Sequence, residues 1–288
     1  MIGWLFGLGS AVLYGMSDFV GGLASRRSHF VVVALLGQCA GLIASALAGL
    51  MIGAESIPRS DLWWGALSGF GTAVGMAFLF RGLSRGAMSV IVPVSAVTGV
   101  SIPVLFGVVV EGQRPSLLAW LGIVVAVPAL WLVAGRQSRN AEGLKGSGVG
   151  DGLVAGVGIA VQYLALAHAS AASGLWPVAA GRVSAVLVLI VMAIFVMRHL
   201  KDEHDRSPLR TTMASGVLAT SAGVLAAAAL AAYAIATRHQ LAAIAVVLSS
   251  MYPVIPVLLG VTVLREHLTR QQSAGLLAAA AATVLLAV

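Results

Sequence analysis

The sequence predicts an all-α integral membrane protein in which ten transmembrane helices form two inverted five-helix repeats. The first observation is composition: of 288 residues, 59% are hydrophobic and only 9% are charged, with a mean hydropathy of +1.00. Soluble globular chains carry about 25% charged residues, and disordered chains are poor in hydrophobic residues, so both classes are excluded. The second observation is a series of long apolar runs, and the third is a similarity between the two halves of the chain.

Ten apolar runs, separated by charged residues, proline or glycine, each have about the length of 20 residues that crosses a bilayer. Arg26 and Arg27 follow the first run, and the polar stretches 136–150 and 198–210 follow the fifth and the seventh. Neither stretch is long enough for a soluble domain. The predicted spans are, in order, 2–23, 30–53, 62–80, 87–110, 116–135, 151–171, 174–197, 211–236, 240–264 and 270–288.

An internal repeat relates the two halves. Ile102–Val108 reads Ile-Pro-Val-Leu-Phe-Gly-Val, and Ile255–Val261 reads Ile-Pro-Val-Leu-Leu-Gly-Val. Three glycines and Tyr14 of the first span align in the same way with three glycines and Tyr163 of the sixth. The predicted organisation is a first five-helix unit at 1–135, a linker at 136–150 and a second five-helix unit at 151–288.

An odd number of spans in each unit makes the second unit enter the membrane from the opposite side, so the two units are inverted. Inverted repeats are typical of secondary transporters, whose substrate site lies near the midplane between the halves. A duplication that only built a stable bundle is the alternative.

Two predicted spans each contain a pair of prolines, Pro93 and Pro103 in the fourth and Pro253 and Pro256 in the ninth. Each removes a backbone hydrogen bond and is expected to bend its helix. Freed carbonyl groups at membrane depth are tolerated where they line a cavity. We therefore expect the fourth and ninth spans to line a pathway, although prolines that only shape packing would give the same pattern.

Several segments resemble the ten-helix EamA-like transporters of the drug/metabolite transporter superfamily. The resemblance rests on Tyr14–Gly22 in the first span and on Leu248–Pro256, which reads Leu-Ser-Ser-Met-Tyr-Pro-Val-Ile-Pro and is followed by Leu-Arg-Glu-His-Leu. Val110–Arg114 stands at the corresponding turn of the first half. Two positions depart from the family pattern: Arg265 replaces a glycine, and Gln38 stands where many relatives have an arginine.

The resemblance implies a secondary active transporter that works by alternating access and moves small metabolites, such as amino acids, related compounds or toxic molecules. Transport in this family is usually outward and often driven by a proton gradient, which implies a multi-pass protein of the plasma (inner) membrane of a bacterium. A passive channel or facilitator for small solutes is the alternative. No catalytic constellation is evident, so we expect neither an enzyme nor a cofactor.

Polar side chains within the spans are the candidates for a substrate cavity, because unpaired polar groups in hydrocarbon are costly. Arg182, at the repeat position equivalent to Gln38, is expected either to attract a carboxylate substrate or to reach the interface. Asp18 is expected to carry a coupled proton, the alternative being an ion pair or a helix cap. The predicted cavity residues are Tyr14, Gln38, Thr98, Gln162, Tyr163, Arg182, Ser249, Ser250 and Tyr252.

The basic residues bear on partners and orientation. The net charge of +7 is spread over loops between apolar runs, so the lipid bilayer and a small-molecule substrate are the expected partners, and nucleic acid is not. The six histidines show no metal-binding spacing. Thirteen of the 17 Lys and Arg residues lie in alternate loops, beginning with the loop between the first two spans, which places both termini outside by the positive-inside rule. The family resemblance implies termini inside, so the orientation stays open, as does the choice between monomer and homodimer.

Overall fold

The structure is a computed structural model that describes residues 2–110, 112, 116–134, 148–199, 211–239 and 251–287. Within these residues it contains ten α-helices, one short 3-10 helix and no strand. The helices are α1 (Ile2–Ser25), α2 (Phe30–Ile52), α3 (Arg59–Arg85), α4 (Met88–Val109), α5 (Leu117–Ala134), α7 (Val149–Ala167), η2 (Ala171–Ser173), α8 (Trp176–His199), α9 (Met213–His239), α11 (Val254–Thr262) and α12 (Arg270–Ala287).

Six of the described helices are long and apolar enough to cross a membrane, namely α2, α3, α4, α7, α8 and α9. A multi-pass all-α fold is therefore confirmed. The count of ten spans and the inversion of the two halves remain predictions.

The helix boundaries differ most from the predicted spans in three places. The third span was expected at 62–80, but α3 extends from Arg59 to Arg85. The sixth span was expected to reach residue 171, but α7 ends at Ala167 and the chain then turns into η2. The ninth span was expected at 240–264, but the described helix α11 covers only Val254–Thr262. Residues 240–250 and most of the predicted linker lie outside the described residues.

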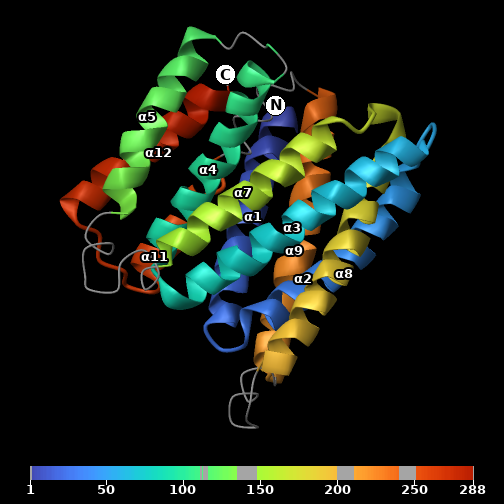
Figure 1. Cartoon of the computed structure of the whole chain (residues 1–288), viewed down its shortest axis with the longest axis horizontal. Coiled ribbons are helices and arrows are strands. Elements are labelled where there is room, and N and C mark those ends of the chain that lie inside the picture. Colours follow the sequence, from blue (N-terminus) through green and yellow to red (C-terminus); the bar gives the residue numbers. More distant parts are fainter. Residues whose placement is uncertain are drawn as a thin grey trace.

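Helices from the two halves of the chain alternate in the bundle (Figure 1). The largest helix contacts pair α1 with α9, α3 with both α7 and α8, and α4 with α7. Helix α2 packs against α8 and α9, and α5 packs against α12 at one edge of the molecule. Most of the packing therefore lies between the halves rather than within one half.

Small residues face the inside of the bundle and large apolar residues face outward. In α2 the buried positions include Gly37, Gly41 and Ser45, whereas Ile43 and Leu47 are 64% and 56% exposed. Lipid solvates large aliphatic side chains, so membrane helices gain most by bringing small residues together. The apolar composition thus serves the lipid-facing surface as much as the interior.

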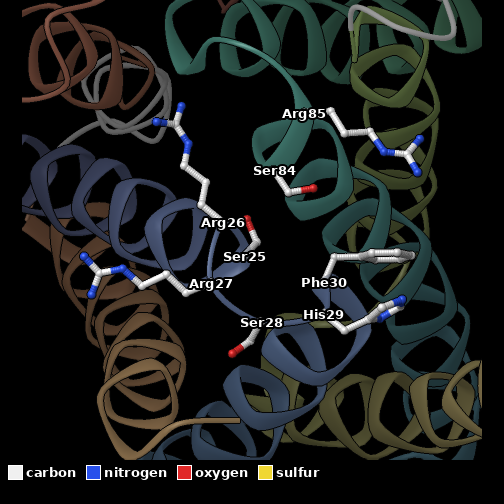
Figure 2. A pocket seen from close by; sticks show the side chains of 8 residues that line it. All are labelled: Ser25, Arg26, Arg27, Ser28, His29, Phe30, Ser84 and Arg85. Atoms are coloured by element: carbon white, nitrogen blue, oxygen red, sulfur yellow. The ribbon is translucent and has the colours of Figure 1, made fainter. Parts of the chain in front are cut away.

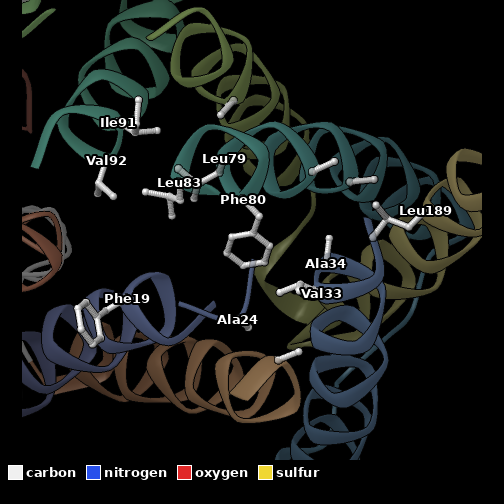
Figure 3. Close-up of a cluster of buried hydrophobic side chains, with 14 of the residues drawn as sticks. Phe19, Ala24, Val33, Ala34, Leu79, Phe80, Leu83, Ile91, Val92 and Leu189 are labelled. Atoms are coloured by element: carbon white, nitrogen blue, oxygen red, sulfur yellow. The ribbon is translucent and has the colours of Figure 1, made fainter. Parts of the chain in front are cut away.

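One cluster of larger apolar side chains joins α1, α2, α3 and α4 (Figure 3). Phe80 is 1% exposed and lies beside Gly21 of α1, where an added Cβ would come 2.5 Å from the Phe80 ring. Leu83 and Ile91 are fully buried next to it. The cluster holds the end of α3 and the start of α4 against α1.

The four prolines do not occupy equivalent places. Pro93 and Pro103 lie inside α4, as expected. Pro253 precedes the first residue of α11 and Pro256 lies in its first turn. An N–H in the first turn has no partner within the helix, so a proline there costs no hydrogen bond. In the described chain this pair therefore begins a helix after the turn that contains Tyr252, and the expectation that it bends the middle of one does not hold for α11.

Candidate functional site

A group of polar side chains lies inside the bundle around Asp18 of α1. Asp18 is 8% exposed, and no hydrogen bond or ion pair joins its carboxylate to another described residue. Tyr14 lies one helical turn earlier and so shares its face of α1. The neighbouring Ser17 donates a hydrogen bond to the carbonyl oxygen of Ala222 in α9, at 2.8 Å, which fixes α1 against α9.

All four tyrosines of the chain belong to this group. The rings of Tyr14 and Tyr252 have centroids 6.2 Å apart and are tilted by 57°, which is an ordinary distance for an aromatic pair. Tyr163, which is 46% exposed, lies within electrostatic range of Tyr14, Asp18 and Tyr233, and Tyr252 lies within the same range of Tyr14, Tyr163 and Asp18. We call Asp18 and the four tyrosines the tyrosine cluster. Its members come from α1, α7, α9 and the turn before α11.

Arg182 of α8 borders the tyrosine cluster and binds Gln38 of α2. Its guanidinium donates a hydrogen bond of 2.6 Å to Gln38 Oε1, and its charge interacts with Tyr14. Gly41, one turn after Gln38, leaves space for the guanidinium, since a Cβ there would come 3.3 Å from Arg182 Cζ. Within the described residues no carboxylate is at ion-pair distance from Arg182.

Not all the predicted cavity residues join this group. Thr98 donates its hydroxyl to Val94 O at 2.8 Å and packs against Gly156, so it serves the contact between α4 and α7. Gln162 is partly buried in α7. Ser249 and Ser250 lie outside the described residues.

Tyr233 was not among the predicted residues, although a signal for it exists in the sequence. It stands in an alanine-rich stretch of α9. A tyrosine hydroxyl within such an apolar run needs a polar partner, and Tyr233 lies close enough to Tyr14 and Tyr163 to act on them electrostatically.

At one end of the bundle, Glu266 joins the two halves. Its Oε1 accepts the backbone N–H of Met88 at 3.0 Å and a guanidinium hydrogen of Arg26 at 3.2 Å. Its Oε2 accepts the backbone N–H and the hydroxyl of Ser89, at 3.1 and 2.7 Å. Because α4 has no side-chain cap of its own at Ala87, Glu266 supplies the acceptor and the negative charge that a helix N-terminus favours. We call these four residues the Glu266 clasp.

At the other end, Asp61 also joins the two halves, but here the acid belongs to the first half and its close donors belong to the second. Its Oδ2 accepts the backbone N–H and the hydroxyl of Ser170, at 3.1 and 2.6 Å, and the hydroxyl of Ser173. Ser60 approaches the other carboxylate oxygen at 3.4 Å. We call these residues the Asp61 clasp. Asp61 opens the third helix of the first half, whereas both of its close donors belong to the second half.

The comparisons with known proteins agree with this arrangement. Residues 1–135 match the family described as the EamA-like transporter family. The resemblance seen in Tyr14–Gly22 is thereby confirmed, and the matched residues cover the first half of the chain. Together with the six apolar helices, this similarity to a transporter family indicates a multi-pass membrane protein.

A solved structure titled only "Crystal structure of protein" superposes on this chain with a TM-score of 0.61 and 16% sequence identity. The superposition covers 99% of this chain and 98% of that one, so the similarity of fold extends over both halves. A search of curated proteins finds no match.

Proposed function

We propose that this EamA-like protein is a secondary active transporter that exports small metabolites across the plasma (inner) membrane of a bacterium by alternating access. The observation that carries the proposal is the tyrosine cluster, with Arg182 beside it, inside the membrane and between the two halves. Ionisable side chains at such depth cost free energy, so their presence indicates a functional site. The similarity to a family of transporters suggests that this function is transport.

The packing of the helices supports two inverted units. Several contacts between the halves have a counterpart when the halves exchange roles: α1 with α9 corresponds to α3 with α7, and α2 with α9 corresponds to α3 with α8. The second helices of the two halves, α2 and α8, contact each other, and so do the fifth helices, α5 and α12. A two-fold axis through the bundle would produce this pattern.

Close contacts between glycines also occur in pairs that correspond when the two halves exchange roles. A Cβ added at Gly223 of α9 would overlap the carbonyl oxygen of Gly37 in α2, and one at Gly69 of α3 would overlap that of Gly181 in α8. Gly37 and Gly181 directly precede the repeat-related pair, Gln38 and Arg182. The hydrogen bond between Gln38 and Arg182 then lies near the two-fold axis, where a substrate site of an inverted-repeat transporter is expected.

The roles of the two ionisable groups follow from their surroundings. Asp18 lies among tyrosine hydroxyls without a cationic partner in the described chain, so it is the group to bind and release a coupled proton. Arg182 holds its position through the neutral amide of Gln38, which leaves its positive charge available to the carboxylate of a substrate. The tyrosine rings supply an amphipathic surface for the remainder of a small metabolite.

Counterflow in proteoliposomes tests the proposal. Candidate solutes come from a metabolite and toxin screen that compares cells with and without the protein. Vesicles loaded with an unlabelled candidate should take up the labelled form transiently and saturably. Uptake without saturation or trans-stimulation would indicate a passive facilitator. The absence of any transported solute would contradict the transporter proposal.

Asp18→Asn tests the proton step separately. The variant should lose accumulation driven by a proton gradient and keep exchange, because asparagine preserves the size and polarity of the site but cannot release a proton. Glu55→Gln removes one exposed carboxylate outside the helices, and this matched loss of an acid should retain both activities. Accumulation that is unchanged in Asp18→Asn would remove Asp18 from coupling.

A further inference from the structure

A second polar site lies at the end of the bundle that carries the Glu266 clasp, away from the tyrosine cluster. It is a surface pocket of about 320 Å³ between the end of α1, the start of α2 and the end of α3. Figure 2 shows Arg85, Phe30 and His29 on one side of the pocket and Arg26 and Arg27 on the other. Its lining residues are Ser25, Arg26, Arg27, Ser28, His29, Phe30, Ser84 and Arg85, and none of them is acidic.

Two of the three arginines belong to ion pairs with carboxylates outside the pocket. Arg26 meets Glu266 at 3.2 Å. Arg85 meets Asp151 at 3.8 Å, but the same carboxylate is closer to Arg81, at 3.3 Å. One carboxylate thus serves two guanidinium groups, which leaves one positive charge uncompensated beside the pocket.

Arg27 adds a second uncompensated charge. It is exposed, and no hydrogen bond or ion pair joins it to another described residue. Among the described residues, the three arginines of the pocket and the adjacent Arg81 have two carboxylate partners, Glu266 and Asp151, which leaves a surplus of two positive charges beside a lining of hydroxyl and imidazole groups.

The hydroxyl of Ser28 is an independent sign of a ligand. Ser28 is only 5% exposed, lines the pocket, and its Oγ has no hydrogen-bond partner in the structure. A buried hydroxyl without a partner costs about 1 to 3 kcal/mol. The hydroxyl is covered in this structure, so an oxyanion in the pocket would accept its proton after the side chain rotates toward the pocket, and would thereby remove that cost.

His29 contributes a further donor. Its Nδ1 accepts the backbone N–H of Val31 at 3.3 Å as the cap of α2. Burial, and then the charge of Arg85, hold the pKa of His29 below its usual value, so the ring is neutral near pH 7 and its proton sits on Nε2. The N-terminus of α2, with its positive helix dipole, begins at the next residue.

We propose that this pocket binds a phosphate group, either the headgroup phosphate of an anionic lipid or a free phosphate ion. Guanidinium and hydroxyl donors around a positively charged pocket match the oxygens of a phosphate. The pocket also lies at the ends of the spans Phe30–Ile52 and Arg59–Arg85, at the level where headgroups surround a membrane protein, and basic pockets between helix ends are known to hold anionic headgroups. The site does not depend on the transport proposal.

Binding to the full-length protein in a neutral detergent tests the site. Short-chain phosphatidylglycerol, short-chain phosphatidylcholine and inorganic phosphate are titrated separately, and the dissociation constant is measured by calorimetry. Wild type should bind phosphatidylglycerol or inorganic phosphate saturably at one site and phosphatidylcholine more weakly. Saturable binding of the lipid alone identifies a headgroup as the ligand, and saturable binding of both probes identifies phosphate itself.

Two variants locate the binding. Arg27→Gln should weaken it by about tenfold, the factor expected for the loss of one charge-assisted hydrogen bond. Ser28→Ala should weaken it by about fivefold without any change of net charge. Arg270→Gln removes an exposed charge from the start of α12, outside the pocket, and should leave binding unchanged. The proposal is overturned if neither probe binds saturably, if Arg27→Gln and Arg270→Gln weaken binding equally, or if Ser28→Ala has no effect.

Discussion

At each end of the helix bundle one carboxylate joins the two halves of the chain, but the two carboxylates bind different partners. Glu266, from the second half, binds backbone N–H groups at the start of α4 and the guanidinium of Arg26. Among the described residues Asp61, from the first half, binds neutral donors only, the N–H of Ser170 and the hydroxyls of Ser60, Ser170 and Ser173. One end is therefore held by charge as well as hydrogen bonds, and the other by hydrogen bonds alone.

This difference has a physical consequence for the proposed alternating access, in which the two ends would open in turn. A contact between a carboxylate, a guanidinium and a helix N-terminus weakens when salt screens the charges, whereas hydrogen bonds from serine to a carboxylate respond less. The Glu266 end and the Asp61 end should thus respond differently to ionic strength. Each clasp crosses between the halves, so each would have to break when its end opens.

The largest effect is expected from Glu266→Ala. The change leaves the N–H groups of Met88 and Ser89 without an acceptor and Arg26 without its carboxylate, which should lower the free energy of unfolding by about 3 kcal/mol. Amide exchange should accelerate at Met88 and Ser89 and stay unchanged at Ser170. Denaturation in mixed micelles and hydrogen exchange measure the two effects. Glu55→Ala, which removes an exposed acid at the other end, is the control, and equal loss of stability in both variants would contradict the role of Glu266.

Asp61→Ala should have the next largest effect. It removes the acceptor shared by Ser170 and Ser173. We expect the free energy of unfolding to fall by roughly half as much as in Glu266→Ala, because no ion pair between described residues is lost. Exchange should accelerate at the Ser170 amide and not at Met88. Acceleration at both ends would mean that the two clasps are one cooperative unit.

Arg26→Gln isolates the charged part of the Glu266 clasp. The guanidinium is about one-third exposed, so its ion pair should contribute about 1 kcal/mol at low salt and less near 1 M salt, where the screening length falls to about 3 Å. A salt titration of unfolding compares the variant with Arg27→Gln, which has no carboxylate partner in the described chain. A salt dependence that is the same in wild type and Arg26→Gln would rule out this ion pair as its source.

Ser60→Ala should have the smallest effect. The hydroxyl of Ser60 is 3.4 Å from Asp61 Oδ1 and the residue is exposed, so we expect a change in unfolding free energy below about 0.5 kcal/mol. Ser170→Ala removes the 2.6 Å hydrogen bond and should cost more. A larger loss in Ser60→Ala than in Ser170→Ala would show that bond length is a poor guide to the strength of the Asp61 clasp.

Most of the helices could be predicted from the sequence because membrane spans are local features. An apolar run of suitable length must satisfy its own backbone hydrogen bonds in lipid, so it becomes a helix wherever it stands. The start of α2 at Phe30 and of α12 at Arg270 was predicted to the residue. The end of α7 was not, since the segment after Ala167 is held by a distant acid, Asp61.

The candidate site was predicted in part. Tyr14 and Asp18 were found because they are polar residues in an apolar span, and Gln38 and Arg182 because of the repeat. The sequence did not show that Gln38 and Arg182 bind each other, or that Tyr233 joins Tyr14. Thr98, equally polar and equally deep, turns its hydroxyl to its own helix.

The sequence by itself indicated a membrane protein and predicted two related sets of helices with a few ionisable groups among them. Each of these properties depends on neighbouring residues or on a simple repeat. The tertiary structure alone decided which of those residues meet. Glu266 reaches Ser89, Asp61 reaches Ser170 and Arg182 reaches Gln38 across more than a hundred residues of chain. Such contacts depend on how helices from the two halves pack, and close packing in turn depends on where glycines let two backbones touch.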